Sequence, residues 1–170
     1  MAASSKRYAI RKALDADIAL LPAIEYAADE LFRQQGIGPL PSPADEETYR
    51  RSLFTLVAGD PPVGFVRAIE IDGEFHLEQM SVVPKHTWKG VGSELLCHVI
   101  EAARECGYAR LTLITFAHIT WNAPFYLKRG FNPLPKLTTG LKRLREREKA
   151  LGLDQLGSRV VLALNLDKKT

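Results

Sequence analysis

Apolar residues in the first part of the chain recur at two spacings, one typical of strands and one typical of helices. A short strand is expected at 8–12, and apolar positions from Ile18 to Phe32 then follow at intervals of three and four residues, which predicts a helix. Asp17 is the expected N-cap of this helix, because a short acidic side chain accepts hydrogen bonds from free N–H groups. Pro22 either kinks the helix or marks its true first turn.

The pattern then changes to short apolar runs separated by turn residues. The segment 36–43 holds two glycines and three prolines and is expected to be a loop, followed by a short helix at 44–51. The strands predicted next are 53–58, 63–71 and 74–83. Asp72-Gly73 is a hairpin signal and Pro84 stops the third strand, so these strands indicate an antiparallel meander.

The C-terminal half alternates between helical and strand patterns. The expected elements are a helix near 91–106, a strand at 110–116, a short helix at 121–129, a basic helix at 136–150 and a strand at 159–166. We therefore expect an α/β fold with a mixed, mostly antiparallel twisted sheet of about six to seven strands and helices on both faces. One domain is expected over residues 1–170, a length that buries a core without metal or disulfide.

Composition and charge narrow the class of protein. The 170 residues are 46% hydrophobic and 25% charged, as in ordinary globular proteins, and the formal charge of +3 fits either a polyanionic small ligand or no charged partner. No apolar run approaches the ~18–20 residues of a membrane span, so no membrane association is expected. The charges of the basic helix are interpreted as a solvated face with pairs such as Lys142 and Glu146; nucleic-acid binding is disfavoured because aromatic residues are not interleaved.

The cysteines and histidines indicate neither a disulfide nor a metal site. Cys97 and Cys106 lie nine residues apart on one predicted helix, on nearly opposite faces, and cannot form a bridge. The chain begins without the uninterrupted apolar stretch of a secretory signal, so a reducing, cytoplasmic location is expected. The four histidines are scattered and do not sit with the cysteines at ligand spacing, so no metal is expected.

Two segments carry candidate chemistry. The strand around Leu77–Pro84 is followed by Lys89-Gly90-Val91-Gly92-Ser93 at the start of a helix. Free N–H groups at a helix start bind phosphate, and glycines let the backbone approach it closely. Alone, this segment is more simply a tight turn, since it matches neither a Walker loop nor a dinucleotide fingerprint. The second segment, Trp121 to Phe131, is a short helix closed by Gly130, in which Tyr126 alone would be interpreted as a packing residue.

Together, the two segments resemble the GNAT superfamily of acetyl-CoA-dependent N-acetyltransferases. The resemblance follows the element order from about Tyr8 to Phe131 and is sharp only over 77–131. It implies a single GNAT-like domain in which strand 77–83 diverges from strand 111–116, with acyl-CoA lying in the gap. It assigns the pyrophosphate to backbone N–H groups of Trp88, Lys89, Gly90, Val91, Gly92 and Ser93, and the pantetheine to Met80, Val82 and Val83. Tyr126 becomes the proton donor to the departing thiolate.

The sequence departs from the family pattern in two places. Thr87 and Trp88 stand where the family usually has Gln or Arg and then often Gly, so a side-chain contact is lost that Lys85, His86 or Lys89 can replace. Many members also carry an asparagine where this chain has Ile119. Asn122 lies four residues before Tyr126, and it either contacts the cofactor or caps the helix that begins near Pro124.

Acetyl transfer to an amine also needs a base and an oxyanion donor. Period two places His76, Glu78, Met80 and Val82 on one face of their strand. Glu78 is the favoured base and needs a raised pKa or a relaying water for that role, although it can equally pair with a cation on a neighbouring strand or face solvent; His76 is the alternative base. A backbone N–H near Met80 or Ser81 is the expected oxyanion donor.

The resemblance thus predicts direct acetyl transfer from acetyl-CoA to a primary amine of a small molecule or peptide, without a metal. The alternatives are an enzyme that uses a longer acyl-CoA, a non-catalytic CoA-binding regulatory module and, from another class, a basic nucleic-acid-binding domain. Dimers are common among similar proteins, so a homodimer is also compatible with the resemblance.

Overall fold

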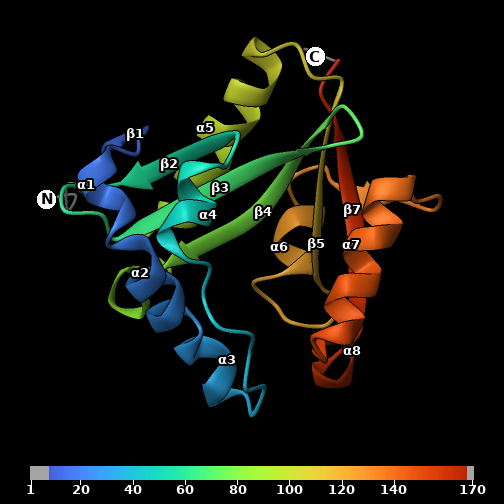
Figure 1. Ribbon diagram of the computed structural model, residues 1–170, viewed down its shortest axis with the longest axis horizontal. Coiled ribbons are helices and arrows are strands. Elements are labelled where there is room, and N and C mark those ends of the chain that lie inside the picture. Colours follow the sequence, from blue (N-terminus) through green and yellow to red (C-terminus); the bar gives the residue numbers. More distant parts are fainter. Residues whose placement is uncertain (1–7, 168–170) are drawn as a thin grey trace, which may run out of the picture.

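A seven-stranded mixed sheet organises the computed structural model, which describes residues 8–167. The strands are β1 (Ile10–Lys12), β2 (Phe54–Ala58), β3 (Gly64–Ile71), β4 (Glu74–Val82), β5 (Arg110–Phe116), β6 (Asn132–Pro133) and β7 (Arg159–Asn165). Their order across the sheet is β1-β2-β3-β4-β5-β7-β6, and β4 with β5 is the parallel pair while the other neighbours are antiparallel (Figure 1). The predicted mixed and mostly antiparallel sheet is confirmed.

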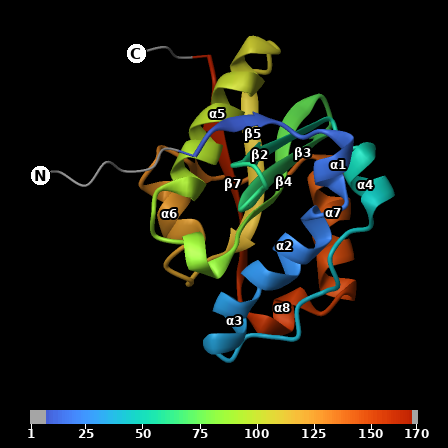
Figure 2. The same ribbon diagram turned by 90° about the vertical axis from the view of Figure 1, so that its left-hand side faces the viewer.

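Helices cover both faces of the sheet, as predicted (Figure 2). On one face lie α5 (Val91–Glu105) and α6 (Ala123–Leu127), and on the other lie α1 (Asp15–Ile18), α2 (Leu21–Ala28), α4 (Glu46–Arg50) and α7 (Thr139–Ala150). The shorter elements are α3 (Glu30–Gln34), α8 (Leu153–Leu156) and the 3-10 turn η1 (Pro84–His86). Each face buries its own apolar cluster, because alternate strand residues point to opposite sides.

The single helix predicted over 18–32 is wrong, because the chain forms α1, α2 and α3 there. Pro22 lies in the first turn of α2, where its missing N–H costs nothing, and it cannot donate the hydrogen bond that would continue α1. The interpretation of Pro22 as a first-turn residue is therefore confirmed.

The N-cap predicted at Asp17 is also wrong. Leu14 is the N-cap of α1 and Asp17 is its third helical residue. From there the Asp17 carboxylate accepts the Leu14 N–H at 2.7 Å and two bonds from the Arg11 guanidinium, at 2.5 and 3.0 Å. The acidic residue thus stabilises the helix start from inside the first turn, and Arg11 holds its pKa below the ordinary range.

The long helix α5 follows its sequence pattern closely. Its buried residues include Leu95, Leu96, Val99 and Ala103, the predicted apolar positions. Cys97 and Cys106 are both free and exposed, as expected. No helix in the described range 8–167 has the length and apolar character that crossing a bilayer requires.

Candidate active site

The parallel strands β4 and β5 diverge after three residue pairs. Pairing joins Phe75, His76 and Leu77 to Leu111, Thr112 and Leu113, and it stops there. From Glu78 onward β4 pairs only with β3, and from Ile114 onward β5 pairs only with β7. The expected divergence of these strands is confirmed, and it opens the sheet as a wedge.

A cleft of about 650 Å³ occupies this wedge and reaches both faces of the sheet. The cleft is lined by residues of the elements that surround the wedge. These are Glu78–Val82 of β4, Ile114–Phe116 of β5, the turn before α5, the helix α6, the helices α2 and α3, and the helices α7 and α8. A ligand in this position therefore contacts both layers of helices at once.

A bulge in β4 sets the direction of its side chains. Ala68 pairs with Leu77 and Arg67 with Gln79, so Glu78 is left without a partner residue on β3. Leu77 lies before the bulge and Met80 after it, yet both pack into the apolar cluster under α5.

The prediction that His76, Glu78, Met80 and Val82 share one face is therefore wrong. The extra residue reverses the alternation, which places Met80 and Val82 on the α5 face and leaves His76 with Glu78 on the opposite side. Glu78 and the free edge of β4 consequently meet the cleft from different sides of the sheet.

The backbone of β4 is free along the diverging edge. The Val83 N–H donates to the Val63 carbonyl at 2.9 Å, which directs it toward β3, and the Val83 carbonyl accepts from the His86 N–H at 2.8 Å. Because successive residues of a strand direct their polar groups to opposite edges, those of Met80 and Val82 point into the wedge. Of the three residues expected to pair with pantetheine, Met80 and Val82 are available and Val83 is engaged elsewhere.

The start of α5 presents unpaired backbone donors to the cleft. Gly90 is the N-cap, with a left-handed φ of +85°, and no side chain caps the helix. Within residues 8–167, the N–H groups of Val91, Gly92 and Ser93 have no acceptor. With the positive end of the helix dipole behind them, these donors favour an anion.

Trp88 takes the position of a family glycine and keeps the glycine-like backbone. Its φ is +61°, in the left-handed region, and its side chain is 74% exposed. The indole lies edge-on to that of Trp121, with ring centroids 6.1 Å apart, and both residues line the cleft. Trp88 therefore adopts a left-handed backbone conformation in the turn before α5.

Of the three side chains expected to replace the missing phosphate contact, Lys85 and Lys89 are exposed beside the turn. His86 accepts or donates a 2.7 Å hydrogen bond with Tyr8, and that bond occupies its Nδ1. None of the three is among the residues that line the cleft.

Arg129 is a basic residue of the cleft that the sequence analysis missed. Its guanidinium donates to Ser93 Oγ and to the Phe125 carbonyl, each at 2.8 Å, and lies 3.6 Å from the centre of the Phe125 ring. These contacts hold a positive charge beside the open start of α5. In the sequence, the one sign of this role was that Arg129 follows Lys128 directly before Gly130.

Tyr126 lies in the cleft, as the resemblance implies. Its side chain is 7% exposed and packs against Phe125 and Phe131, while its hydroxyl has no hydrogen-bond partner among residues 8–167. Burial raises the pKa of the phenol above its ordinary range. The hydroxyl is thus protonated at neutral pH and free to donate.

Asn122 occupies the N-cap position of α6, but its side chain does not cap the helix. The side-chain oxygen instead accepts from Thr115 Oγ1 at 2.7 Å and from the Phe116 N–H at 3.4 Å. Asn122 thereby ties the end of β5 to α6 while lining the cleft. The capping alternative is wrong for its side chain.

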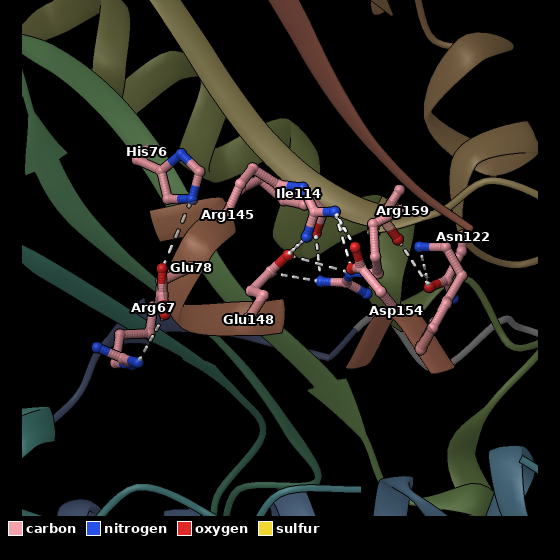
Figure 3. Close-up of polar contacts among 11 residues, drawn as sticks. Arg67, His76, Glu78, Ile114, Asn122, Arg145, Glu148, Asp154 and Arg159 are labelled. Atoms are coloured by element: carbon pink, nitrogen blue, oxygen red, sulfur yellow. Dashed lines mark hydrogen bonds and ion pairs between the residues drawn. The ribbon is translucent and has the colours of Figure 1, made fainter. Parts of the chain in front are cut away.

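Glu78 is held between a cation and a neutral imidazole (Figure 3). Arg67 Nη2 lies 3.8 Å from Glu78 Oε1, and His76 Nε2 lies 3.5 Å from Oε2. Burial raises the pKa of Glu78, and the Arg67 charge opposes that rise. Glu78 lines the cleft and faces a neighbouring-strand cation, so the pairing considered for it is observed, while its role as the base stays a prediction.

His76 lies behind Glu78 and does not line the cleft. It is 1% exposed, and its Nδ1 is 2.8 Å from Thr112 Oγ1. Burial, helped by Arg67, lowers its pKa to about 4, so it is neutral at physiological pH. Its position favours a supporting role rather than direct contact with a substrate.

Two further carboxylates, Glu25 on α2 and Asp29 at its C-cap, were missed because only the apolar positions of this segment were considered. Glu25 and Asp29 are four residues apart and both line the cleft. The Tyr49 hydroxyl donates to Glu25. Burial and the Glu25 charge raise the pKa of Asp29 to about 6.

On the wall of the cleft opposite α2, two arginines bind the carboxylate of Glu148 on α7 (Figure 3). Arg145 Nη1 is 2.5 Å and Arg159 Nη2 is 2.7 Å from its carboxylate, and Arg145 also donates to Asp154 at 2.8 Å. The network joins α7, α8 and β7. The pair predicted between Lys142 and Glu146 is absent from the ion pairs of the described residues, and the ion pair within α7 is Arg145 with Glu148.

Within residues 8–167, no three metal-ligating side chains of histidine, cysteine or acidic type cluster in space. The polar groups that line the cleft are carboxylates, arginines, a phenol and backbone donors.

Comparison with known proteins agrees with this geometry. The family model described as the acetyltransferase (GNAT) family matches residues 25–131, more than half of the chain. The ribosomal-protein-S18-alanine N-acetyltransferase of Escherichia coli is similar in structure, with a TM-score of 0.66, 21% identity, and 95% of this chain and 96% of that chain covered. PaiA N-acetyltransferase of Thermoplasma acidophilum, in complex with coenzyme A, has a TM-score of 0.65, 18% identity and coverages of 92% and 98%.

A larger protein shares the same fold over part of its length. N-acetylglutamate synthase of Neisseria gonorrhoeae, complexed with coenzyme A and N-acetyl-glutamate, has a TM-score of 0.67 and 21% identity, with 94% of this chain and 35% of that chain covered. At these identities the structural matches show a shared fold, and the family model shows the relationship in sequence.

Proposed function

Since the chain belongs to the GNAT family of acetyltransferases, we propose that it transfers the acetyl group of acetyl-CoA directly to a primary amine. The acceptor amine is carried by a small molecule or a peptide. The observation that carries this proposal is the meeting of three features in one cleft: the uncapped start of α5, the free edge of β4 and the unpartnered hydroxyl of Tyr126.

The α5 face of the cleft is the proposed cofactor side. The backbone donors of Val91, Gly92 and Ser93 face the pyrophosphate, with Trp88, Lys89 and Gly90 shaping the turn before them. Arg129 supplies the side-chain charge that the turn lacks. The free carbonyl of Met80 and the free polar groups of Val82 pair with the pantetheine amides, and Asn122 borders the same channel.

The opposite face is the proposed acceptor side, where Glu78 takes the proton of the incoming ammonium directly or through a water. An amine of the lysine kind has a pKa of ~10.4, so its proton must be removed before the nitrogen can attack. A raised carboxylate pKa makes Glu78 a better proton acceptor than an exposed glutamate. His76 and Arg67 position its two oxygens.

The transfer step forms the C–N bond and breaks the C–S bond of the thioester. The Met80 N–H, which points into the wedge, faces the negative charge that develops on the carbonyl oxygen. Tyr126 donates its proton to the departing sulfur, so that CoA leaves as a thiol, and the phenolate recovers a proton from the newly acylated nitrogen, which must lose its second proton to become an amide. A thiol pKa of ~8.5 lies below that of the buried phenol, and the protonated donor is therefore present throughout the working range.

The test is release of CoA thiol in the presence of a panel of primary amines, each measured against an acceptor-free blank. We expect Tyr126→Phe to lower kcat by about 100-fold, the usual share of a general acid, with an unchanged dissociation constant for acetyl-CoA by calorimetry. Full activity of the Phe variant contradicts the role of Tyr126. Acetyl-CoA binding without thiol release for any amine contradicts the enzymatic proposal itself.

A further inference from the structure

The acceptor half of the cleft lies between two helical walls on the face opposite α5. One wall consists of α2, α3 and the loop at 40–42, and the other consists of α7 and α8 (Figure 1). The cleft establishes that a ligand has room here, and the side chains of the two walls indicate its chemistry. The inference rests on the proposed function, because it concerns the amine that this function consumes.

Asp29 is a half-buried carboxylate in the first wall with no hydrogen bond or ion pair among residues 8–167. The nearest cation in sequence, Arg33, donates to Glu30 at 2.9 Å and to the Tyr26 carbonyl at 3.2 Å, so its charge offsets that of Asp29 only in part. Burial and Glu25 raise the pKa of Asp29 to about 6, so the carboxylate is mostly ionised at neutral pH and above. A desolvated negative charge of this kind is stabilised by a cationic ligand.

Other cations around the acceptor half are already occupied. Arg67 faces Glu78, while Arg145 and Arg159 are bound to Glu148. Arg147 lines the second wall, but it is exposed, so water and salt screen its charge more strongly than that of Asp29. The uncompensated charge of the acceptor half is thus negative.

Apolar side chains line the walls around these carboxylates. They are Ala28, Leu31, Phe32 and Leu40 on the first wall and Leu144, Leu151 and Leu153 on the second. Such a lining suits methylene groups and disfavours a strongly hydrated chain. Glu78 and Asp29 therefore provide two anionic positions in a slot with apolar sides.

We propose that the acceptor is a primary amine with a second positive charge beyond an apolar spacer, as in an alkane diamine, with the reacting nitrogen at Glu78 and the distal cation at Asp29. The reaction is the acetyl transfer described above. Asp29 acts on binding alone, through a charge-assisted contact to the distal ammonium.

The probe is a series of alkane α,ω-diamines, compared at pH 8 with n-alkylamines of the same carbon number and with ω-amino carboxylates. We expect kcat/KM to peak at one diamine length and to exceed that of the matching monoamine by about tenfold or more, the size of one charge-assisted hydrogen bond. Asp29→Asn should remove this advantage by raising KM for the diamine, while kcat/KM for the monoamine and the affinity for acetyl-CoA stay unchanged.

Glu101→Gln, on the exposed side of α5, is the matched control because it removes one negative charge away from the cleft, and it should alter neither ratio. Equal kcat/KM for diamines and monoamines overturns the inference, as does a preference for ω-amino carboxylates, which would assign recognition to Arg147. An Asp29→Asn variant that loses activity equally on both amines also overturns it. Absence of thiol release with every amine instead contradicts the proposed function, so the two failures are distinguishable.

Discussion

At the scale of single residues, Glu78 shows how one carboxylate is adapted to act as a base. Burial raises its pKa and Arg67 limits the rise, so the wild-type rate should fall as the pH drops through that raised value and the carboxylate becomes protonated. Glu78→Gln should lower kcat/KM and remove this limb of the profile, which leaves the titration of the amine itself. The measurement is kcat/KM against pH for both proteins with one acceptor.

The neighbouring histidine provides the control for that profile. His76→Asn removes the imidazole but keeps Glu78. Because His76 is already neutral above its pKa of about 4, the fall of kcat/KM at low pH should shift along the pH axis without disappearing. A Glu78→Gln profile that matches the wild type contradicts the assignment of the base.

Arg129 carries a prediction about cofactor affinity. Arg129→Ala should weaken CoA binding by about tenfold, since a cation held beside phosphates makes a charge-assisted contact. Arg129→Lys should recover part of this loss, and the difference between Arg and Ala should shrink at high salt. Calorimetry with CoA at two salt concentrations is the measurement, and equal affinity of the Ala variant contradicts the role.

Arg129 and Asp29 also show which site residues the sequence could not reveal. The phosphate turn and Tyr126 were predictable because their roles follow from local backbone shape and from the family motif. Arg129 and Asp29 line the cleft because distant elements pack together, as in the bond from Arg129 to Ser93, and helix periodicity does not encode such packing.

At the scale of elements, Gly90 before α5 and Gly92 inside α5 are suited to glycine for different physical reasons. Gly90 has a φ of +85° with open space around it, so Gly90→Ala should lower the free energy of unfolding by about 1 kcal/mol through backbone strain. Gly92 has an ordinary φ, and a methyl there would meet Met80 Cε at 3.9 Å, an ordinary contact.

Gly92→Ala should therefore leave the free energy of unfolding unchanged or higher, because alanine is the better helix former. It should still weaken CoA binding, since Gly92 lines the cleft where the backbone must approach a phosphate. Denaturant unfolding and calorimetry on both variants test the distinction. Loss of stability in Gly92→Ala contradicts it.

The order of elements was predictable, and the errors have local physical causes. Helix periodicity identified α5 and strand patterns identified β2 to β5, because their buried faces are continuous. The bulge at Glu78 was not predictable, because one unpaired residue leaves the composition of the strand unchanged. It nevertheless moves every later side chain of β4 to the opposite face of the sheet. The two-residue strand β6 and the single turn α8 are too short to produce a period.

At the scale of the whole molecule, the acceptor wall of α7 and α8 depends on the Glu148 network for its attachment to the sheet. The side chains of Arg145, Glu148 and Arg159 are 15%, 12% and 10% exposed, so water replaces little of a lost contact. Glu148→Ala leaves two arginines without their shared partner, and the free energy of unfolding should fall by about 3 kcal/mol, as for other buried ion pairs that lose one member.

The Glu148→Ala substitution also tests whether amine binding and CoA binding depend on different halves of the cleft. Because α7 and α8 line only the acceptor half, a displaced wall should raise KM for the amine while the dissociation constant for CoA, which depends on α5 and β4, stays the same. Glu146→Ala, which removes an exposed carboxylate two residues away, should change neither stability nor KM. A Glu148→Ala protein of lowered stability with wild-type KM for the amine would show that the network stabilises the fold without shaping the acceptor site.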